Sequence, residues 1–272
     1  MEGGRRIGRM EARLLLQQAT GLTASALLAH PEWPASDVSQ AAYRHLVGRR
    51  AAGEPVAYLL GWREFYGHEF RVAPGVLIPR PETELLVEQG LTVLAGRVAP
   101  RVLDLGCGSG CIGLSLALAR PDAEVWAVDV APAALALAQD NAAALGVGAR
   151  WRCVESDWLT ALPGTLRFDL IVSNPPYIAA SDPHLGQGDL RFEPPGALAS
   201  GADGLDALRQ IIMHAHGYLQ PDGWLWLEHG HDQAAVVRTL LEAAGYCDLG
   251  QQRDLAGILR ISGGRIKHGR QA

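Results

Sequence analysis

The hydrophobic pattern of the chain changes near residue 100. From there on, short runs of Val, Leu and Ile alternate with alanine- and leucine-rich stretches long enough for helices. Strands buried on both faces have near-continuous apolar sequences, and helical segments between them lead to the next parallel strand. The pattern therefore predicts an α/β fold with helices on both faces of a parallel sheet. The predicted strands are 101–105, 124–130, 151–155, 168–173 and 223–228, and the predicted helices are 113–120 and 132–145.

Two later runs, 246–249 and 257–261, also have strand character, but no helical segment separates them. Strands joined by a short connection pair antiparallel. We therefore expect these two strands to form an antiparallel hairpin at the end of the sheet.

The first part of the chain follows a different pattern, with Leu and Ala at helical spacing as far as residue 55. Pro31 and Pro34 interrupt this pattern, so we expect several short helices. Aromatic and β-branched residues surround Gly67 in the segment 62–72, which predicts a β-hairpin. The predicted parts are a helical domain over 1–55, a linker with a hairpin over 56–80 and an α/β domain over 81–272.

The composition is that of a globular protein, with 48% apolar and 19% charged residues among 272. The sequence contains no run of 18 apolar residues, so no membrane-spanning helix is expected. An apolar signal-peptide core does not follow the charged N-terminus. Four cysteines are too few for a disulfide framework, which favours a reducing compartment. The expected location is therefore the cytoplasm.

Charge is distributed unevenly within a net charge of −5. Residues 1–80 carry ten arginines and seven acidic residues, whereas residues 81–272 carry 14 basic and 22 acidic residues. Binding to duplex DNA through its phosphates needs a large basic surface, so direct DNA binding is not expected. The arginines near the N-terminus are interpreted as a solvated face, with contact to a protein substrate as the alternative; they are Arg5, Arg6, Arg9 and Arg13.

A glycine-rich loop follows the first predicted strand of the α/β part and leads into a helix. Glycines in this place let backbone N–H groups approach a ligand at the positive end of the helix. Asp129 ends the next strand, 23 residues after Gly106, where its carboxylate can accept hydrogen bonds from two ribose hydroxyls. The combination predicts an adenosine-containing ligand. The candidate binding residues of the loop are Asp104, Gly106, Cys107, Gly108, Ser109 and Gly110.

The position of Asp104 bears on which adenosine compound binds. An anion facing the turn would repel the pyrophosphate of NAD but would suit the ammonium group of S-adenosylmethionine (SAM), so SAM is favoured. Asp157 and Trp158 follow the third strand and could cover the adenine, with the carboxylate accepting from its amino group and the indole packing on its face. The alternative for Trp158 is a place in the core.

The segment Asn174-Pro175-Pro176-Tyr177 directly follows the fourth strand, at the edge where ligands of open α/β sheets bind. An amide or aromatic amine nitrogen is a poor nucleophile because its lone pair is delocalised. Two acceptors on its hydrogens, the side-chain oxygen of Asn174 and the carbonyl of Pro175, would draw the N–H bonds out of plane and direct the lone pair. The prolines hold these acceptors in place beforehand, and Tyr177 can stack on the planar group. The motif therefore predicts methyl transfer from SAM to such a nitrogen.

With these motifs the chain resembles the PrmC/HemK family of protein-(glutamine-N5) methyltransferases, which act on peptide chain release factors. The resemblance begins near Glu54 and includes segments 76–87, 191–194 and 227–230. It implies a Rossmann-like, seven-stranded SAM-dependent methyltransferase domain with a small helical N-terminal domain and a β-hairpin linker. It also implies that the helical domain docks the substrate, which is the glutamine of a Gly-Gly-Gln tripeptide in a release factor.

The resemblance also implies roles for individual residues. Residues 106–110, Asp129 and Trp158 would hold SAM, and residues 174–177 would hold the glutamine amide, with Asn174 near both. No metal site and a monomeric enzyme are expected.

Other functions share these motifs. A ribosomal-protein glutamine methyltransferase would have a similar catalytic domain, and a DNA adenine-N6 methyltransferase needs the same acceptors around its target amine. A SAM-binding or RNA-associated protein without catalysis is a third alternative, which the intact 174–177 motif disfavours.

The segment 178–204, rich in Pro, Gly and Asp, is expected to be a mobile lid over the amide, with a plain surface loop as the alternative.

Overall fold

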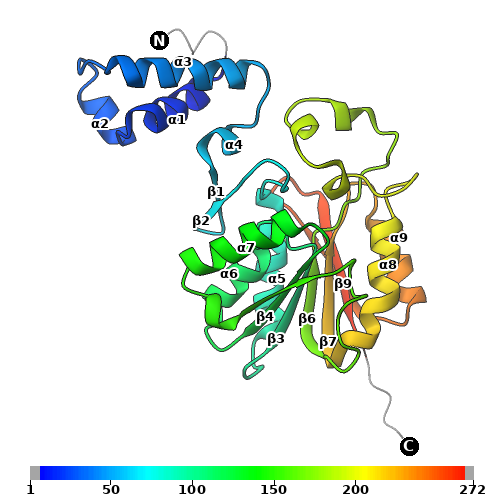
Figure 1. Cartoon of the computed structure of the whole chain (residues 1–272). Helices are drawn as coiled ribbons and strands as arrows, with labels where there is room; N and C mark the ends of the chain where they lie inside the picture. Colours follow the sequence, from blue (N-terminus) through cyan, green and yellow to red (C-terminus); the bar gives the residue numbers. More distant parts are fainter. Residues whose placement is uncertain (1–6, 267–272) are drawn as a thin grey trace, which may run out of the picture.

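The computed structural model describes residues 7–266, so Arg5 and Arg6 lie outside the described part. The N-terminal helices lie apart from a large sheet, and a two-stranded hairpin connects the two (Figure 1). These first elements are α1 (Arg9–Thr20), α2 (Ala24–Ala29), α3 (Asp37–Ala51), α4 (Val56–Leu60), β1 (Trp62–Phe65) and β2 (His68–Arg71). The predicted helices and hairpin are present. Thr23 and Ser36 cap α2 and α3 by accepting backbone N–H groups, which fixes where these helices begin.

The large sheet has seven strands in the order β5-β4-β3-β6-β7-β9-β8. The strands are β3 (Arg101–Leu105), β4 (Glu124–Asp129), β5 (Trp151–Glu155), β6 (Phe168–Ser173), β7 (Leu219–Glu228), β8 (Cys247–Arg253) and β9 (Leu259–Arg265). Strands β3 to β7 are parallel, and β9 pairs antiparallel with both β7 and β8. The seven-stranded α/β fold and its antiparallel end are therefore confirmed.

The last two strands extend further than predicted because polar residues and glycines continue them. Gly263 of β9 pairs with Trp226 of β7 on one side and with Gly250 of β8 on the other. A Cβ on Gly263 would lie 2.4 Å from the Leu225 carbonyl oxygen and 2.4 Å from the Trp226 ring. Gly263 therefore lies within a strand, where the absence of a side chain leaves room for the Trp226 ring.

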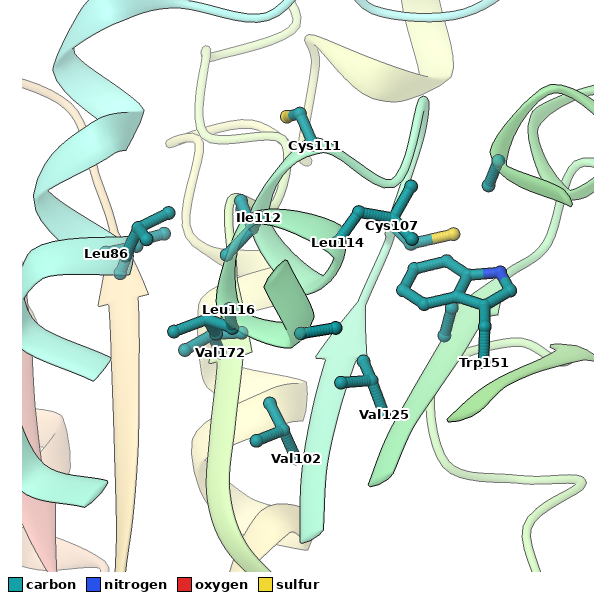
Figure 2. Packing of buried hydrophobic residues seen from close by; sticks show 14 of the residues in the cluster. Leu86, Val102, Cys107, Cys111, Ile112, Leu114, Leu116, Val125, Trp151 and Val172 are labelled. Carbon is teal, nitrogen blue, oxygen red and sulfur yellow. The ribbon is translucent and has the colours of Figure 1, made fainter. Parts of the chain in front are cut away.

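Helices cover both faces of the sheet (Figure 1). On one face lie α5 (Glu84–Leu94), α6 (Cys111–Ala119) and α7 (Pro132–Ala144), and on the other α8 (Asp206–Ala215) and α9 (Ala234–Ala243). Successive residues of β3 alternate between the faces, with Val102 in the core under α5 to α7 and Leu103 in the core under α8 and α9. Figure 2 shows part of the first core, where Trp151 lies beside Leu114 and Cys107.

Short 3₁₀ segments complete the chain. They are η2 (Pro81–Thr83), η3 (Gly148–Arg150), η4 (Pro183–Gly186), η5 (Leu190–Phe192), η6 (Pro195–Ala197) and η7 (His216–Tyr218).

The hairpin is attached to the sheet domain through Asn141 of α7. The Asn141 side chain accepts the backbone N–H of Arg71 at 2.8 Å and donates to the backbone carbonyls of Arg71 and Ser109. Asn141 is buried, so these bonds satisfy a polar group that would otherwise be costly to bury. One side chain thus ties the hairpin to the glycine loop.

The strand order places the two predicted motifs next to each other. The chain goes from β3 to β4 and β5 on one side of the sheet, and from β6 to β7 on the other. A crevice forms at the carboxyl ends of strands where this direction reverses. The final residues of β3 and β6, Leu105 and Ser173, are paired, and the Ser173 hydroxyl donates to the Leu105 carbonyl at 2.6 Å. The glycine loop and the 174–177 motif therefore start side by side.

We expect Gly113→Ala to destabilise the protein. A Cβ on Gly113 would lie 2.9 Å from the Trp151 ring and 3.0 Å from both Asp104 and Val125, so these buried groups would have to move. Overpacking of this kind costs about 1–3 kcal/mol, to be measured by urea unfolding. Gly148→Ala is the matched control, because its added Cβ would meet no atom of residues 7–266 within 4 Å beyond its chain neighbours. Equal stability of the two variants would contradict the packing around α6.

Candidate active site

A cavity of about 500 Å³ opens at the carboxyl edge of β3, β4, β5 and β6. Its wall includes predicted site residues from four strand ends: Gly106, Cys107, Gly108, Ser109, Asp129, Asp157, Trp158, Asn174 and Pro176. The linker segment 75–80 and parts of the segment 194–201 close it from the other side. Four predicted site residues lie outside this wall, namely Asp104, Gly110, Pro175 and Tyr177.

The glycine loop turns sharply beneath the cavity. Gly106 and Gly108 have φ angles of 67° and 56°, in the left-handed region that favours glycine. A Cβ on Gly106 would also lie 3.4 Å from the Trp158 ring. Trp158 itself has a φ of 50°, a conformation that costs energy for a side chain of this size and is concentrated at functional sites. The loop and the indole are thus held against each other.

Asp129 connects the glycine loop to the start of α7. One carboxylate oxygen accepts the N–H of Gly108 and the other accepts the N–H of Ala131, both at 2.9 Å. A carboxylate has about four lone-pair positions, so each oxygen can accept a further hydrogen bond from the cavity. The side chain therefore shapes the loop and presents acceptors to a ligand.

Asp104 lies beneath the loop instead of on the cavity wall. One oxygen accepts the Gly113 N–H at 2.9 Å, at the start of α6, and the other has no partner among the described residues. Burial, opposed by the Gly113 bond and helped by the nearby Asp129 charge, raises the pKa of Asp104 to about 7. Its observed contact is with the first turn of α6.

Asn174 is held by residues that come from other parts of the chain. Its Nδ2 donates to the Thr83 hydroxyl at 3.0 Å, and that hydroxyl donates to Oε2 of Glu228 at 2.6 Å. No described residue donates to Oδ1 of Asn174, and Asn174 lies on the cavity wall. The side-chain oxygen is thus free for a ligand.

The carboxylate of Glu228 also accepts the Tyr177 hydroxyl, at 3.0 Å. Burial is the main cause that raises the pKa of Glu228 to about 7, although the bonds from Thr83 and Tyr177 oppose it. Burial and the Glu228 charge raise the pKa of Tyr177 well above its usual value, so its phenol remains neutral and can donate. The Tyr177 hydroxyl thus helps to hold the Glu228 carboxylate in place. Stacking of the Tyr177 ring on a target group stays a prediction.

The segment 178–204 forms part of the cavity wall and is attached at several points. Glu193 is buried, accepts the backbone N–H of Ile78 at 3.1 Å and forms an ion pair with Arg80. Farther along, Asp189 forms an ion pair with Arg50 of α3 at 2.8 Å. The segment therefore connects the linker and the N-terminal helices; its motion as a lid stays a prediction.

Thr83, Glu228 and Glu193 have no individual role that the sequence motifs predict. One feature of the sequence could have indicated Glu228: it is an acidic residue at the end of the apolar run 223–228, and a charge in such a place needs specific partners. The cysteines of the glycine loop are buried, and burial raises the pKa of Cys111 to about 12, so its thiol is inert. Within residues 7–266 no group of three or more metal-ligating side chains is present.

Family models match two parts of the chain. The model described as "Methyltransferase small domain" matches residues 81–187, and "PrmC N-terminal domain" matches residues 3–61. A solved structure of the T. thermophilus 16S rRNA N2 G1207 methyltransferase RsmC with AdoMet and guanosine is 25% identical, with a TM-score of 0.57, over 76% of this chain and 50% of that chain. The L11 methylase from Lactobacillus delbrueckii subsp. bulgaricus has the same fold, at 21% identity and a TM-score of 0.52, over 73% of this chain and 86% of that chain. Fold and cavity thus define a methyltransferase.

Curated relatives narrow this class. A release factor glutamine methyltransferase of Bordetella pertussis is 57% identical over 95% of this chain and 95% of its own length. Another, from Burkholderia pseudomallei, is 54% identical over 94% of this chain and 92% of its own length. The chain belongs to the release factor glutamine methyltransferase family, as the resemblance in its sequence indicated.

The raised pKa of Asp104 predicts a pH dependence of stability. Asp104 binds a proton more readily when folded than when unfolded, so its contribution is fully present below its ordinary pKa of 3.8 and is lost as pH rises through about 7. Asp104→Asn keeps the acceptor for Gly113 but removes the titration. Its free energy of unfolding should therefore depend less on pH between 4 and 8 than that of the wild type, as measured by urea unfolding. Asp140→Asn, an exposed change in α7, should leave the wild-type slope; an unaltered slope in Asp104→Asn would contradict the titration of this buried carboxyl.

Proposed function

We propose that this chain transfers a methyl group from SAM to the side-chain amide nitrogen of the glutamine in the Gly-Gly-Gln tripeptide of peptide chain release factors. The observation that carries the proposal is the unengaged Asn174 oxygen on the wall of the same cavity as the glycine loop. Membership of the family gives the substrate class.

The cavity wall fits SAM in size and in chemistry. About 500 Å³ lies within the range of small-molecule sites, and the wall combines an indole with carboxylates. Asp129 would accept from the ribose hydroxyls, while Asp157 and Trp158 would contact the adenine. Ser109 also contributes to the wall, and its side chain is buried. SAM supplies an electrophilic methyl group on a sulfonium sulfur.

Residues 174–177 act on the glutamine amide. Oδ1 of Asn174, on the cavity wall, and the carbonyl of Pro175, which directly follows it in the chain but lies outside that wall, accept the two amide hydrogens and direct the nitrogen lone pair toward the methyl carbon. A C–N bond forms as the S–C bond breaks with its electron pair left on sulfur, and the nitrogen then releases one proton to solvent. Pro176 fixes the backbone, so the acceptors are in place before the substrate binds. No strong base is needed, because the methylated nitrogen is acidic.

Several further features belong to this proposal. The N-terminal helices dock the release factor, and the segment 178–204 covers the bound amide. Direct binding to DNA is not part of the function, since residues 81–272 carry 14 basic and 22 acidic residues. The enzyme acts as a monomer in the cytoplasm, a reducing compartment that suits its four free cysteines. Within residues 7–266 no helix is long and apolar enough to cross a membrane.

We expect Asn174→Ala to lose turnover by a factor of about 10² or more, while SAM still binds, because one acceptor for the amide is gone. Labelled SAM should methylate a release factor with the wild-type protein and leave a ribosomal protein and duplex DNA unlabelled. Near-normal turnover of Asn174→Ala would refute the role of its oxygen. Label in the ribosomal protein or in DNA, with none in the release factor, would favour the alternative substrates.

The contact of Asp129 with ribose predicts a second effect. Asp129→Ala should weaken SAM affinity about tenfold or more, because it removes the acceptors and frees the Gly108 N–H. Isothermal titration calorimetry measures the change. Asp140→Ala is the matched control, since this aspartate is exposed on α7 and outside the cavity. Equal SAM affinity of both variants would contradict the assignment.

A further inference from the structure

Two buried side chains determine the environment of the Asn174 amide nitrogen. Thr83 lies at the end of η2, where α5 begins, and Glu228 is the last residue of β7. They are 2% and 1% exposed, and 145 positions separate them in the sequence. Both hydrogen bonds of the Thr83 hydroxyl, one to each of Glu228 and Asn174, are therefore shielded from water.

The direction of these bonds follows from their donors and acceptors. A threonine hydroxyl has one hydrogen, and Thr83 gives it to the carboxylate of Glu228 at 2.6 Å. While Glu228 is ionised, only lone pairs of Thr83 remain for Asn174, so the amide presents its NH₂ group there. In the reversed orientation two acceptor oxygens would face each other at 3.0 Å, without a hydrogen between them. The arrangement thus turns Oδ1 of Asn174 away from Thr83 and leaves it for the substrate.

Tyr177 completes the arrangement from the same motif as Asn174. Its hydroxyl donates to Oε1 of Glu228, so the carboxylate is held on both oxygens. Asn174 reaches Glu228 through the Thr83 hydroxyl, and Tyr177, three positions after Asn174, bonds to Glu228 directly. The 174–177 motif and the end of β7 are therefore joined by a closed set of hydrogen bonds. Such a set holds a side chain in one orientation before the substrate arrives.

We propose that Thr83 and Glu228 are positioning residues for methyl transfer, which hold the Asn174 carboxamide with its oxygen toward the substrate nitrogen. This inference rests on the proposed function. Without the Thr83 hydroxyl, the amide can rotate and present its NH₂ group to the substrate, where donor would face donor. Neither residue reacts; each acts through Asn174.

Thr83→Val tests the proposal, because it keeps the shape of the side chain and removes the hydroxyl. We expect kcat for release factor methylation to fall about tenfold or more, while SAM affinity measured by calorimetry is unchanged. Thr83→Ser restores the hydroxyl and should recover most of kcat. Thr92→Val is the matched control, since the Thr92 hydroxyl is exposed and, among the residues that the structure describes, bonds only to the Glu88 carbonyl of its own helix.

Glu228 gives an independent comparison. In Glu228→Gln the side-chain oxygen can still accept from Thr83, so the direction of the Thr83 bond is kept, while the new NH₂ group donates to the Tyr177 oxygen and only that bond is reversed. Glu228→Leu removes the acceptor. We expect the Gln variant to retain a kcat well above that of the Leu variant. If the Leu variant does not fold, the Val and Ser variants of Thr83 decide the question.

Three results would overturn the proposal: wild-type kcat in Thr83→Val, equal losses in Thr83→Val and Thr83→Ser, or a fall in SAM affinity as large as the fall in kcat. The wild-type protein in the same assay separates this outcome from failure of the proposed function. Absence of release factor methylation by the wild type refutes the function itself. Wild-type methylation together with an unimpaired Thr83→Val refutes only the positioning role.

Discussion

The pairing of β3 with β6 is the constraint on which the site depends. Their last residues, Leu105 and Ser173, lie opposite each other, so the glycine loop and the Asn-Pro-Pro-Tyr segment emerge from adjacent positions. The direction of the chain reverses at this point, which leaves the carboxyl ends of the strands open to a ligand. A donor site and an acceptor site for a methyl group can thus share one cavity without any long loop to bring them together.

Buried polar groups then fix the details around this cavity. Asp104 holds the start of α6, Asn141 ties the hairpin to the glycine loop, and Glu228 connects Thr83 with Tyr177. Each is costly to bury, and burial raises the pKa of both Asp104 and Glu228 to about 7. The gain is rigidity, because the acceptors that we propose for the substrate amide do not have to be ordered during the reaction.

Much of the fold could be predicted from local patterns. Apolar runs identified the sheet strands, and the glycine loop and residues 174–177 follow two of them directly. The ends of β8 and β9 could not be predicted because their residues are polar or glycine. Gly263, for example, lies in β9 because a side chain there would clash with Trp226. Thr83 and Glu228 could not be connected, since residues 145 positions apart meet only in the folded chain. The position of Asp104 next to the glycine loop follows from the sequence. The direction of its side chain, which lies beneath the loop and not on the cavity wall, depends on the folded chain.

A crystal structure of the enzyme with a Gly-Gly-Gln peptide and S-adenosylhomocysteine, the demethylated form of SAM, would test most directly whether one cavity holds both reactants. We predict that the glutamine nitrogen lies within hydrogen-bond distance of both Oδ1 of Asn174 and the Pro175 carbonyl oxygen, and faces the sulfur. A glutamine side chain bound elsewhere, or one with its oxygen in that place, would contradict the assignment of this site.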